Sequence, residues 1–219
     1  MRILITAGGT REYIDPVRFI SNASSGKMGY ALARAALKAG HQVTLITATT
    51  TQREPAGAKS IRVESTSEMF EAVKKYFSRC DCLIMAAAVA DYTPVRSAKT
   101  KLKKGGNHLA IKLKPTPDIL KWAGKQRKGK RKEEKGKRRI VVGFALEDKN
   151  LRVNAEKKLT DKNLDMIVAN SPAAIAADKS DVQIKTPNSS WIKIENATKA
   201  AIAKKVVYLA EKLYQAKLK

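Results

Sequence analysis

Residues 24–29 (SSGKMG) combine two serines, two glycines and a lysine immediately before a predicted helix. Backbone N–H groups and the helix dipole at such a position favour an anion such as a phosphate. Gly26 and Gly29 would remove side chains that could block this anion. The spacing matches neither a Walker A loop nor GxGxxG, so a capped helix with packing glycines is the alternative interpretation.

Three further stretches could contact the same ligand. Residues 86–92 (AAAVADY) end a predicted buried strand with small residues, and Asp91 could accept hydrogen bonds from ligand hydroxyls or simply face solvent. Residues 99–104 (KTKLKK) could form a flap strand that places a lysine over an anion, or a solvated loop. Residues 8–10 (GGT) would let a ligand approach the backbone, or form a plain tight turn.

The elements that must position these residues alternate between strand and helix, which predicts a parallel sheet. We expect strands at 2–7, 42–48, 60–64, 81–89, 108–113, 140–145 and 164–169, a hairpin at 182–185 and 191–194, and helices after residue 26, after Glu68, after Thr116, at 150–160 and at 197–217. The predicted fold class is α/β, with a doubly wound, Rossmann-like, mostly parallel sheet and a small β-hairpin or flap extension. Ligands bind at the carboxyl edge of such sheets. We expect one domain over residues 1–219.

Local signals predict where the helices begin and end. Ser24 or Ser25 could cap the first helix, and Gly40 stands where its C-terminal end is expected. Ser65 and Glu68 match a capping box. Pro117 is expected at the first position of the third helix.

The net charge of +24 first suggests a nucleic-acid partner. The segment Lys125–Arg139 carries ten cations against two glutamates, and we interpret it as a solvated insertion. Few aromatic residues accompany the cations, so an aromatic stacking platform is not evident. A basic surface would also attract anionic substrates such as nucleotides and phosphate esters.

Cys80 and Cys82 are too few for a Cys₄ zinc site and are expected to be reduced thiols. The chain contains no run of eighteen apolar residues, so no membrane partner is expected. The N-terminus leads directly into a strand pattern without the layout of a signal peptide, which makes the expected location cytoplasmic.

Two longer runs resemble phosphopantothenoylcysteine synthetase: residues 14–33 (IDPVRFISNASSGKMGYALA) and residues 86–92. Further matches follow in the same order at 101–104 (KLKK), 116–120 (TPDIL), 142–147 (VGFALE) and 161–170 (DKNLDMIVAN). The resemblance implies a ligase of coenzyme A biosynthesis, here expected as a stand-alone enzyme. A nucleoside triphosphate with Mg²⁺ would activate 4′-phosphopantothenate as an acyl-nucleotidylate, and cysteine would then attack it. The sequences of residues 24–29 and 101–104 resemble the bacterial type of this synthetase, which favours CTP over ATP.

The resemblance also implies roles for individual residues. Asn22 would stabilise the acyl-nucleotidylate, and Lys101 would be needed to form it. Arg18 would reach the substrate of the neighbouring subunit, which implies a homodimer. Ala87, Ala88 and Asp91 would line the substrate together with Arg18 and Asn22, while the metal ligands are left unassigned. The expected nucleotide-binding positions are Gly8, Ser24, Gly26, Gly29, Met85, Ala86, Ala87, Asp91, Lys101, Pro117, Asp118, Ile119, Leu120, Phe144, Lys158, Lys162 and Asn170.

Two other functions are weighed against the ligase. An NAD(P)-dependent oxidoreductase would need a GxGxxG turn and an acidic residue after the second strand, where residues 47–50 (TATT) stand instead. A Tyr-x-x-x-Lys spacing does occur at Tyr208 and Lys212, in the predicted terminal amphipathic helix. A nucleic-acid-binding protein would show tight, salt-sensitive binding to RNA or DNA.

Overall fold

The computed structural model describes residues 1–106, 108–127, 138–175 and 177–217. Eight strands form one sheet, in the order β12 (Ile192–Thr198), β11 (Lys179–Lys185), β10 (Met166–Asn170), β9 (Ile140–Leu146), β6 (Cys82–Met85), β1 (Arg2–Ala7), β4 (Gln42–Thr47) and β5 (Lys59–Arg62). The six strands from β10 to β5 run parallel, whereas β11 and β12 form an antiparallel hairpin. This order reverses between β1 and β6, as in doubly wound dinucleotide-binding folds. The predicted fold class is confirmed.

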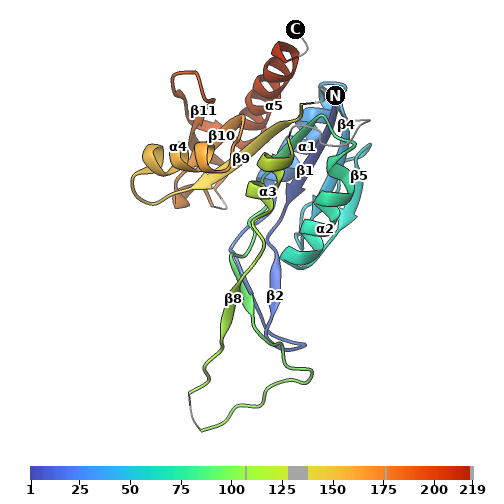
Figure 1. Ribbon diagram of the computed structural model, residues 1–219, viewed down its shortest axis with the longest axis vertical. Coiled ribbons are helices and arrows are strands. Elements are labelled where there is room, and N and C mark those ends of the chain that lie inside the picture. The colour runs from blue at the N-terminus through green and yellow to red at the C-terminus, as the bar shows by residue number, and fades with distance from the viewer. Residues whose placement is uncertain (107, 128–137, 176, 218–219) are drawn as a thin grey trace.

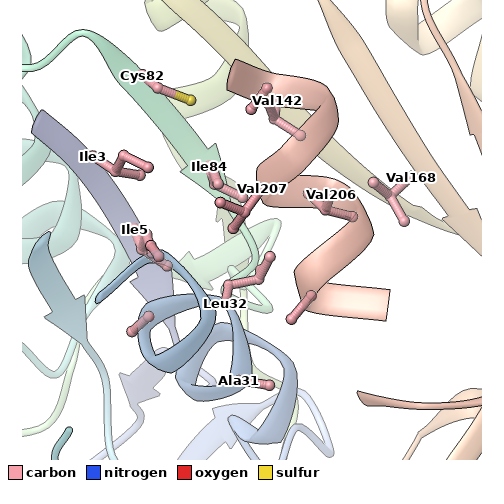
Figure 2. Packing of buried hydrophobic residues seen from close by; sticks show 14 of the residues in the cluster. Ile3, Ile5, Ala31, Leu32, Cys82, Ile84, Val142, Val168, Val206 and Val207 are labelled. Carbon is pink, nitrogen blue, oxygen red and sulfur yellow. The ribbon is translucent and has the colours of Figure 1, made fainter. Parts of the chain in front are cut away.

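Helices cover both faces of the sheet because the buried strands alternate their apolar side chains between two cores. Ile3 and Ile5 face α1 (Lys27–Lys38) and α5 (Lys199–Ala216), and Figure 2 shows this cluster with Val206 and Val207 of α5. Leu4 faces the opposite core, which is closed by α2 (Thr66–Phe77), α3 (Ile119–Gln126) and α4 (Leu151–Asp161). The parallel strands are therefore buried on both sides.

The helix ends differ in part from the local signals. At α1 the N-cap residue is Gly26, with φ 75°, rather than the predicted Ser24 or Ser25. The Ser24 hydroxyl accepts a hydrogen bond from the Gly26 N–H and not from the first helical turn. The end of α1 is as predicted, with Gly40 at φ +80°. Asp118 caps α3 by accepting from the Lys121 N–H, so the prediction of Pro117 at the first helical position is wrong.

The capping box of α2 is confirmed for one of its two hydrogen bonds. Ser65 accepts from the Glu68 N–H at 3.2 Å. The Glu68 carboxylate accepts from the Glu64 N–H instead of the Ser65 N–H. Elsewhere, Cys80 and Cys82 are buried, and burial raises the pKa of Cys82.

Two antiparallel strand pairs lie outside the main sheet and project from it (Figure 1). They are β2 (Arg11–Tyr13) with β3 (Phe19–Ser21), and β7 (Tyr92–Pro94) with β8 (Leu113–Pro115). We call residues 11–21 and the described part of 92–115 the arm. The sequence predicted only a connection at 11–22, and the predicted strand at 108–113 is wrong because strand pairing there begins at Leu113. Residues 99–104 form no strand, so the flap is built by β7 and β8.

The base of the arm is fixed by a buried hydrogen-bond network. The Thr10 hydroxyl accepts from the Ala90 N–H at 2.9 Å and lies 3.0 Å from the Thr66 hydroxyl. The buried Glu12 carboxylate accepts from the Thr66 N–H at 2.8 Å, at the start of α2. Thr116 donates to the Ala90 carbonyl at 2.6 Å. Both strand pairs of the arm are thus joined to the sheet where they leave it.

The described ends of the basic segment Lys125–Arg139 meet at Asp165, before β10; its residues 128–137 lie outside the described residues. Asp165 accepts from Arg127 at 2.8 Å and lies 3.9 Å from the Arg138 guanidinium at the other end of the segment. It also accepts from Lys217 at 2.6 Å and from the Val141 N–H at 2.9 Å. Asp165 lies at the amino ends of β9 and β10, so the segment is attached at the edge of the sheet opposite the carboxyl ends. Within the described ranges, no helix has the length and apolar character needed to cross a membrane.

Replacing Gly124 by alanine should lower the free energy of unfolding by about 2 kcal/mol or more, as overpacking of a filled site does. A Cβ at Gly124 would overlap the Lys162 carbonyl oxygen, where α3 meets the end of α4. Gly105→Ala is the matched control because a Cβ there would meet nothing within 4 Å. Urea denaturation of both variants checks this, and equal midpoints would contradict it.

Candidate functional site

Two adjoining cavities, of about 430 and 300 Å³, lie at the carboxyl ends of β6, β9 and β10. They share Ala87, Val89, Asp91, Phe144 and Lys158, and we call the two together the cleft. This is the edge at which doubly wound sheets bind ligands. Of the sequence-predicted site residues, the structure places the following along the cleft: Asn22, Ser24, Gly26, Met85, Ala86, Ala87, Ala88, Asp91, Pro117, Asp118, Ile119, Leu120, Phe144, Lys158, Lys162 and Asn170.

The larger cavity is built around the start of α1. Residues 22–28 line it, and the first turn of α1 contains no acidic residue. The positive end of the helix dipole therefore faces the cavity, an arrangement that favours phosphate. Asn22 donates from Nδ2 to the Val89 carbonyl at 3.0 Å, which holds the amide beside residues 86–91. The amide carries a second N–H, so this contact orients Asn22 without using all of its donors.

The smaller cavity gathers charges of both signs. Lys158 and Lys162 stand one turn apart on the same face of α4, and Lys162 forms an ion pair with Asp118 at 2.9 Å. Burial, together with the nearby ammonium of Lys162, lowers the pKa of Lys158. Burial opposes ionisation of Asp118, but the Lys121 N–H and the Lys162 ammonium hold its pKa below the usual range. With Phe144 and Asp91, this cavity offers an aromatic ring, cations and a hydroxyl acceptor.

Two predicted glycines support the wall of the cleft without lining it. Gly8 has φ +80° in the turn after β1, and a Cβ there would lie 2.8 Å from the Ala48 carbonyl oxygen. A Cβ at Gly29 would lie 2.5 Å from that of Ala7. The expectation that Gly29 clears space for an anion is therefore wrong, since its missing side chain faces β1 and lets α1 pack closely. A backbone contact from Gly8 or Gly29 to a nucleotide stays a prediction.

Arg18 and Lys101 lie in the arm and do not line the cleft of their own chain. Arg18 donates from Nε to the Asp15 carboxylate at 2.9 Å and from Nη2 to the Leu102 carbonyl. Lys101 precedes Leu102 and is exposed. The structure thus brings these two predicted catalytic residues near each other, but apart from Asn22.

Lys27 and Lys199 line the cleft but are missing from the sequence-predicted site. Lys27 stands inside residues 24–29, so its position in that run was an available signal. Lys199 is the first residue of α5 and reaches the cleft only because the hairpin of β11 and β12 returns the chain there. No local pattern around Lys199 indicates a site. Among the described residues, no three His, Cys, Asp or Glu side chains gather in a way that could hold a metal ion by themselves.

Comparison with known proteins gives a family match over nearly the whole chain. A family model described as the DNA/pantothenate metabolism flavoprotein C-terminal domain matches residues 1–213. A crystal structure of the C-terminal domain of a coenzyme A biosynthesis bifunctional protein, CoaBC, superposes with a TM-score of 0.81 at 37% identity. The match covers 98% of this chain and 96% of that one.

Two curated relatives are longer proteins. The coenzyme A biosynthesis bifunctional protein CoaBC of Bacillus subtilis (strain 168) is 47% identical over 176 residues, covering 80% of this chain and 41% of that protein. A cysteine/cysteine sulfinic acid decarboxylase from an unknown prokaryotic organism is 42% identical over 211 residues, covering 94% of this chain and 56% of that protein. The chain therefore spans about half the length of these relatives.

Proposed function

The chain belongs to the family of the DNA/pantothenate metabolism flavoprotein C-terminal domain, and we propose that it is a ligase that joins 4′-phosphopantothenate to cysteine in coenzyme A biosynthesis. The observation that carries the proposal is the cleft, in which all but one of the sequence runs that resemble the synthetase family meet at one sheet edge. The family membership is also the reason for preferring this activity to an oxidoreductase or a nucleic-acid-binding protein.

The cleft suits a nucleoside triphosphate. Its phosphates would bind at the start of α1, and the sugar and base would occupy the smaller cavity, where Asp91 can accept from ribose hydroxyls. The substrate carboxylate attacks the α-phosphorus, the bond to the β-phosphate oxygen breaks, and pyrophosphate leaves. The cysteine amine then attacks the acyl carbon of the acyl-nucleotidylate, and the nucleoside monophosphate departs.

Positioning and charge neutralisation explain how such a site would accelerate both steps. Asn22 would donate to the oxyanion that develops when the amine attacks, since the Val89 contact already orients its amide. Lys158, and Lys101 once the arm brings it to a cleft, would balance charge on the carboxylate and the phosphates. This assignment does not require a nucleophilic side chain of the protein.

We favour CTP as the nucleotide because the sequences of residues 24–29 and 101–104 resemble the bacterial type; ATP is the alternative. Mg²⁺ would neutralise charge on the triphosphate. It is commonly held by one or two carboxylates together with phosphates, and Asp91 is a carboxylate shared by both cavities.

The arm supports the proposal of a homodimer. It exposes large apolar side chains, which on a soluble protein mark an interaction surface: Val17, Phe19, Tyr92, Val95, Leu109, Ile111 and Leu113. Arg18 lies in this arm, outside the cleft of its own chain. A second copy that covers the apolar arm would receive Arg18 at its own cleft.

Incubation with 4′-phosphopantothenate, cysteine, Mg²⁺ and CTP should give 4′-phosphopantothenoylcysteine, CMP and pyrophosphate, measured by mass spectrometry. Asn22→Ala should accumulate the acyl-cytidylate, because activation would proceed while attack by the amine slows about 100-fold or more. Asn188→Ala, in the exposed turn between β11 and β12, is the control. AMP release from ATP would change only the nucleotide, whereas no product with either triphosphate would refute the ligase.

A further inference from the structure

Lys27 and Lys199 stand where the cleft meets a second cavity. This second cavity is a groove of about 910 Å³ between α1 and α5, and both lysines line the groove as well as the cleft. Three further cations, Arg34, Lys38 and Lys204, line the groove, with Asp178 as its acidic residue. The junction therefore has a positive potential that reaches into the cleft.

Local contacts fix the ammonium of Lys199 at this junction. Thr198 caps α5 by accepting from the Ala201 N–H, which sets the position of Lys199 as the first helical residue. The ammonium donates to the Ala174 carbonyl at 2.9 Å and to the Ser180 hydroxyl at 3.4 Å. An ammonium has three donors, so one remains for a ligand in the cleft.

Lys27 lies across the junction, in the first turn of α1. Its ammonium pairs with Asp178 at 3.0 Å, but the Asp178 side chain is 92% exposed. An exposed ion pair contributes little, so a phosphate could replace this partner at small cost. Burial and the nearby charge of Lys27 lower the pKa of Lys199, as expected for two ammonium groups that face one space.

We propose that Lys27 and Lys199 form a subsite for the two outer phosphates of the nucleoside triphosphate, which leave as pyrophosphate. The inference rests on the proposed function and adds two residues to it. The start of α1 would hold the inner phosphate, and the two ammonium groups, beyond it towards the groove, would hold the outer ones. A nucleoside monophosphate has no group that reaches this subsite.

Lys199→Met should weaken binding of CTP and of inorganic pyrophosphate about 10-fold or more, while CMP binding stays within about twofold of wild type. Isothermal titration calorimetry with the three ligands measures this. Lys199→Arg should restore most of the affinity, and Lys212→Met, an exposed lysine farther along α5, should change none of the three. The KM for CTP should rise with the loss of affinity, and the KM for cysteine should stay unchanged.

The outcomes separate the subsite from the ligase. An equal loss for CMP and CTP in Lys199→Met would indicate a structural role and overturn the subsite. Wild-type affinity for pyrophosphate in that variant would overturn it as well. Failure of the wild-type protein to form product would instead refute the proposed function, whatever the pyrophosphate titration shows.

Discussion

Arg18→Met and Lys158→Met, each nearly inactive alone, should recover about one quarter of wild-type ligase activity when the two variants share dimers. Each substitution removes a cation that we assign to substrate or nucleotide, and the loss for either variant alone should be about 100-fold. Arg18 belongs to the arm and Lys158 to the cleft, so the two defects lie in different parts of the chain.

The expected recovery follows from dimer symmetry. In a mixed dimer, one site joins the intact cleft of the Arg18→Met subunit to the intact arm of the Lys158→Met subunit, and the other site carries both defects. About half of randomly assembled dimers are mixed, and half of their sites are intact. Activity of the co-expressed pair, purified through one tag common to both variants so that all dimers are retained, measures the fraction.

The control pairs Lys158→Met with Lys162→Met. Both lysines line the cleft of one chain, so every mixed dimer would contain two damaged clefts and recovery should be absent. Recovery by the first pair no greater than by this control would show that Arg18 does not act across a dimer. A monomer in sedimentation experiments would contradict the same proposal directly.

Asp15→Asn should disorder the arm and reduce ligase activity about 100-fold, close to the effect of losing Arg18 itself. The buried Asp15 carboxylate accepts from the backbone N–H groups of Val17, Arg18 and Leu102 and from the Arg18 guanidinium. A carboxamide would keep one acceptor oxygen for the backbone N–H groups of Val17 and Arg18, but it would direct an N–H group at the Arg18 guanidinium and at the Leu102 N–H. The contact between the β2–β3 turn and residue 102 would therefore be lost.

The same contacts make the order of the arm depend on pH. The Arg18 guanidinium, aided by the three backbone N–H groups, holds the pKa of Asp15 well below its usual range, although burial opposes the shift. A lowered carboxyl pKa in the folded state contributes stability that is present above the unfolded pKa, about 3.9, and is lost at lower pH. Wild-type arm order should therefore persist at neutral pH and decrease below about pH 4.

Hydrogen–deuterium exchange tests both expectations, with Asp15→Asn measured at pH 7 and the wild type measured above and below about pH 4. Asp15→Asn should lose protection at residues 14–18 and 97–102 at pH 7, while the strands of the main sheet keep theirs, because Asp15 holds Val17, Arg18 and Leu102, which all belong to the arm. Asp181→Asn removes a carboxylate that accepts one backbone N–H in the β11–β12 hairpin, and should leave the arm unchanged. Full protection of the arm in Asp15→Asn would contradict the assigned role.

The sheet was predictable from the sequence because its parallel strands are continuous apolar runs, such as residues 2–7 and 140–145. The arm was not, because its strands are three residues long and bury only Glu12 and Pro94, without a hydrophobic periodicity that a core would impose. The run at 108–113 alternates like a strand, yet no core buries either of its faces.

The cleft was largely predictable because residues 22–28, 86–89 and 117–120 enter it as contiguous runs at strand or helix ends. Lys199 could not be predicted, since its place depends on the tertiary return of the β11–β12 hairpin. The resemblance assigned Arg18 and Lys101 to the site, and a single chain does not bring them there. In the proposed homodimer their role depends on a second copy, whose position no local sequence pattern indicates.

The buried network at the base of the arm ends one residue from each of two predicted ligand contacts. Ala90 precedes Asp91 and Thr116 precedes Pro117, and the Thr116 hydroxyl joins them. In the proposed dimer, each arm would thus be fixed to one cleft at its base and reach the other cleft at its tip. Any change in arm position on nucleotide binding would then alter both clefts. Binding at one cleft would change the affinity of the other, and such coupling is reciprocal by thermodynamic necessity. The two active sites would behave as one cooperative unit, with nucleotide binding curves that depart from a simple hyperbola.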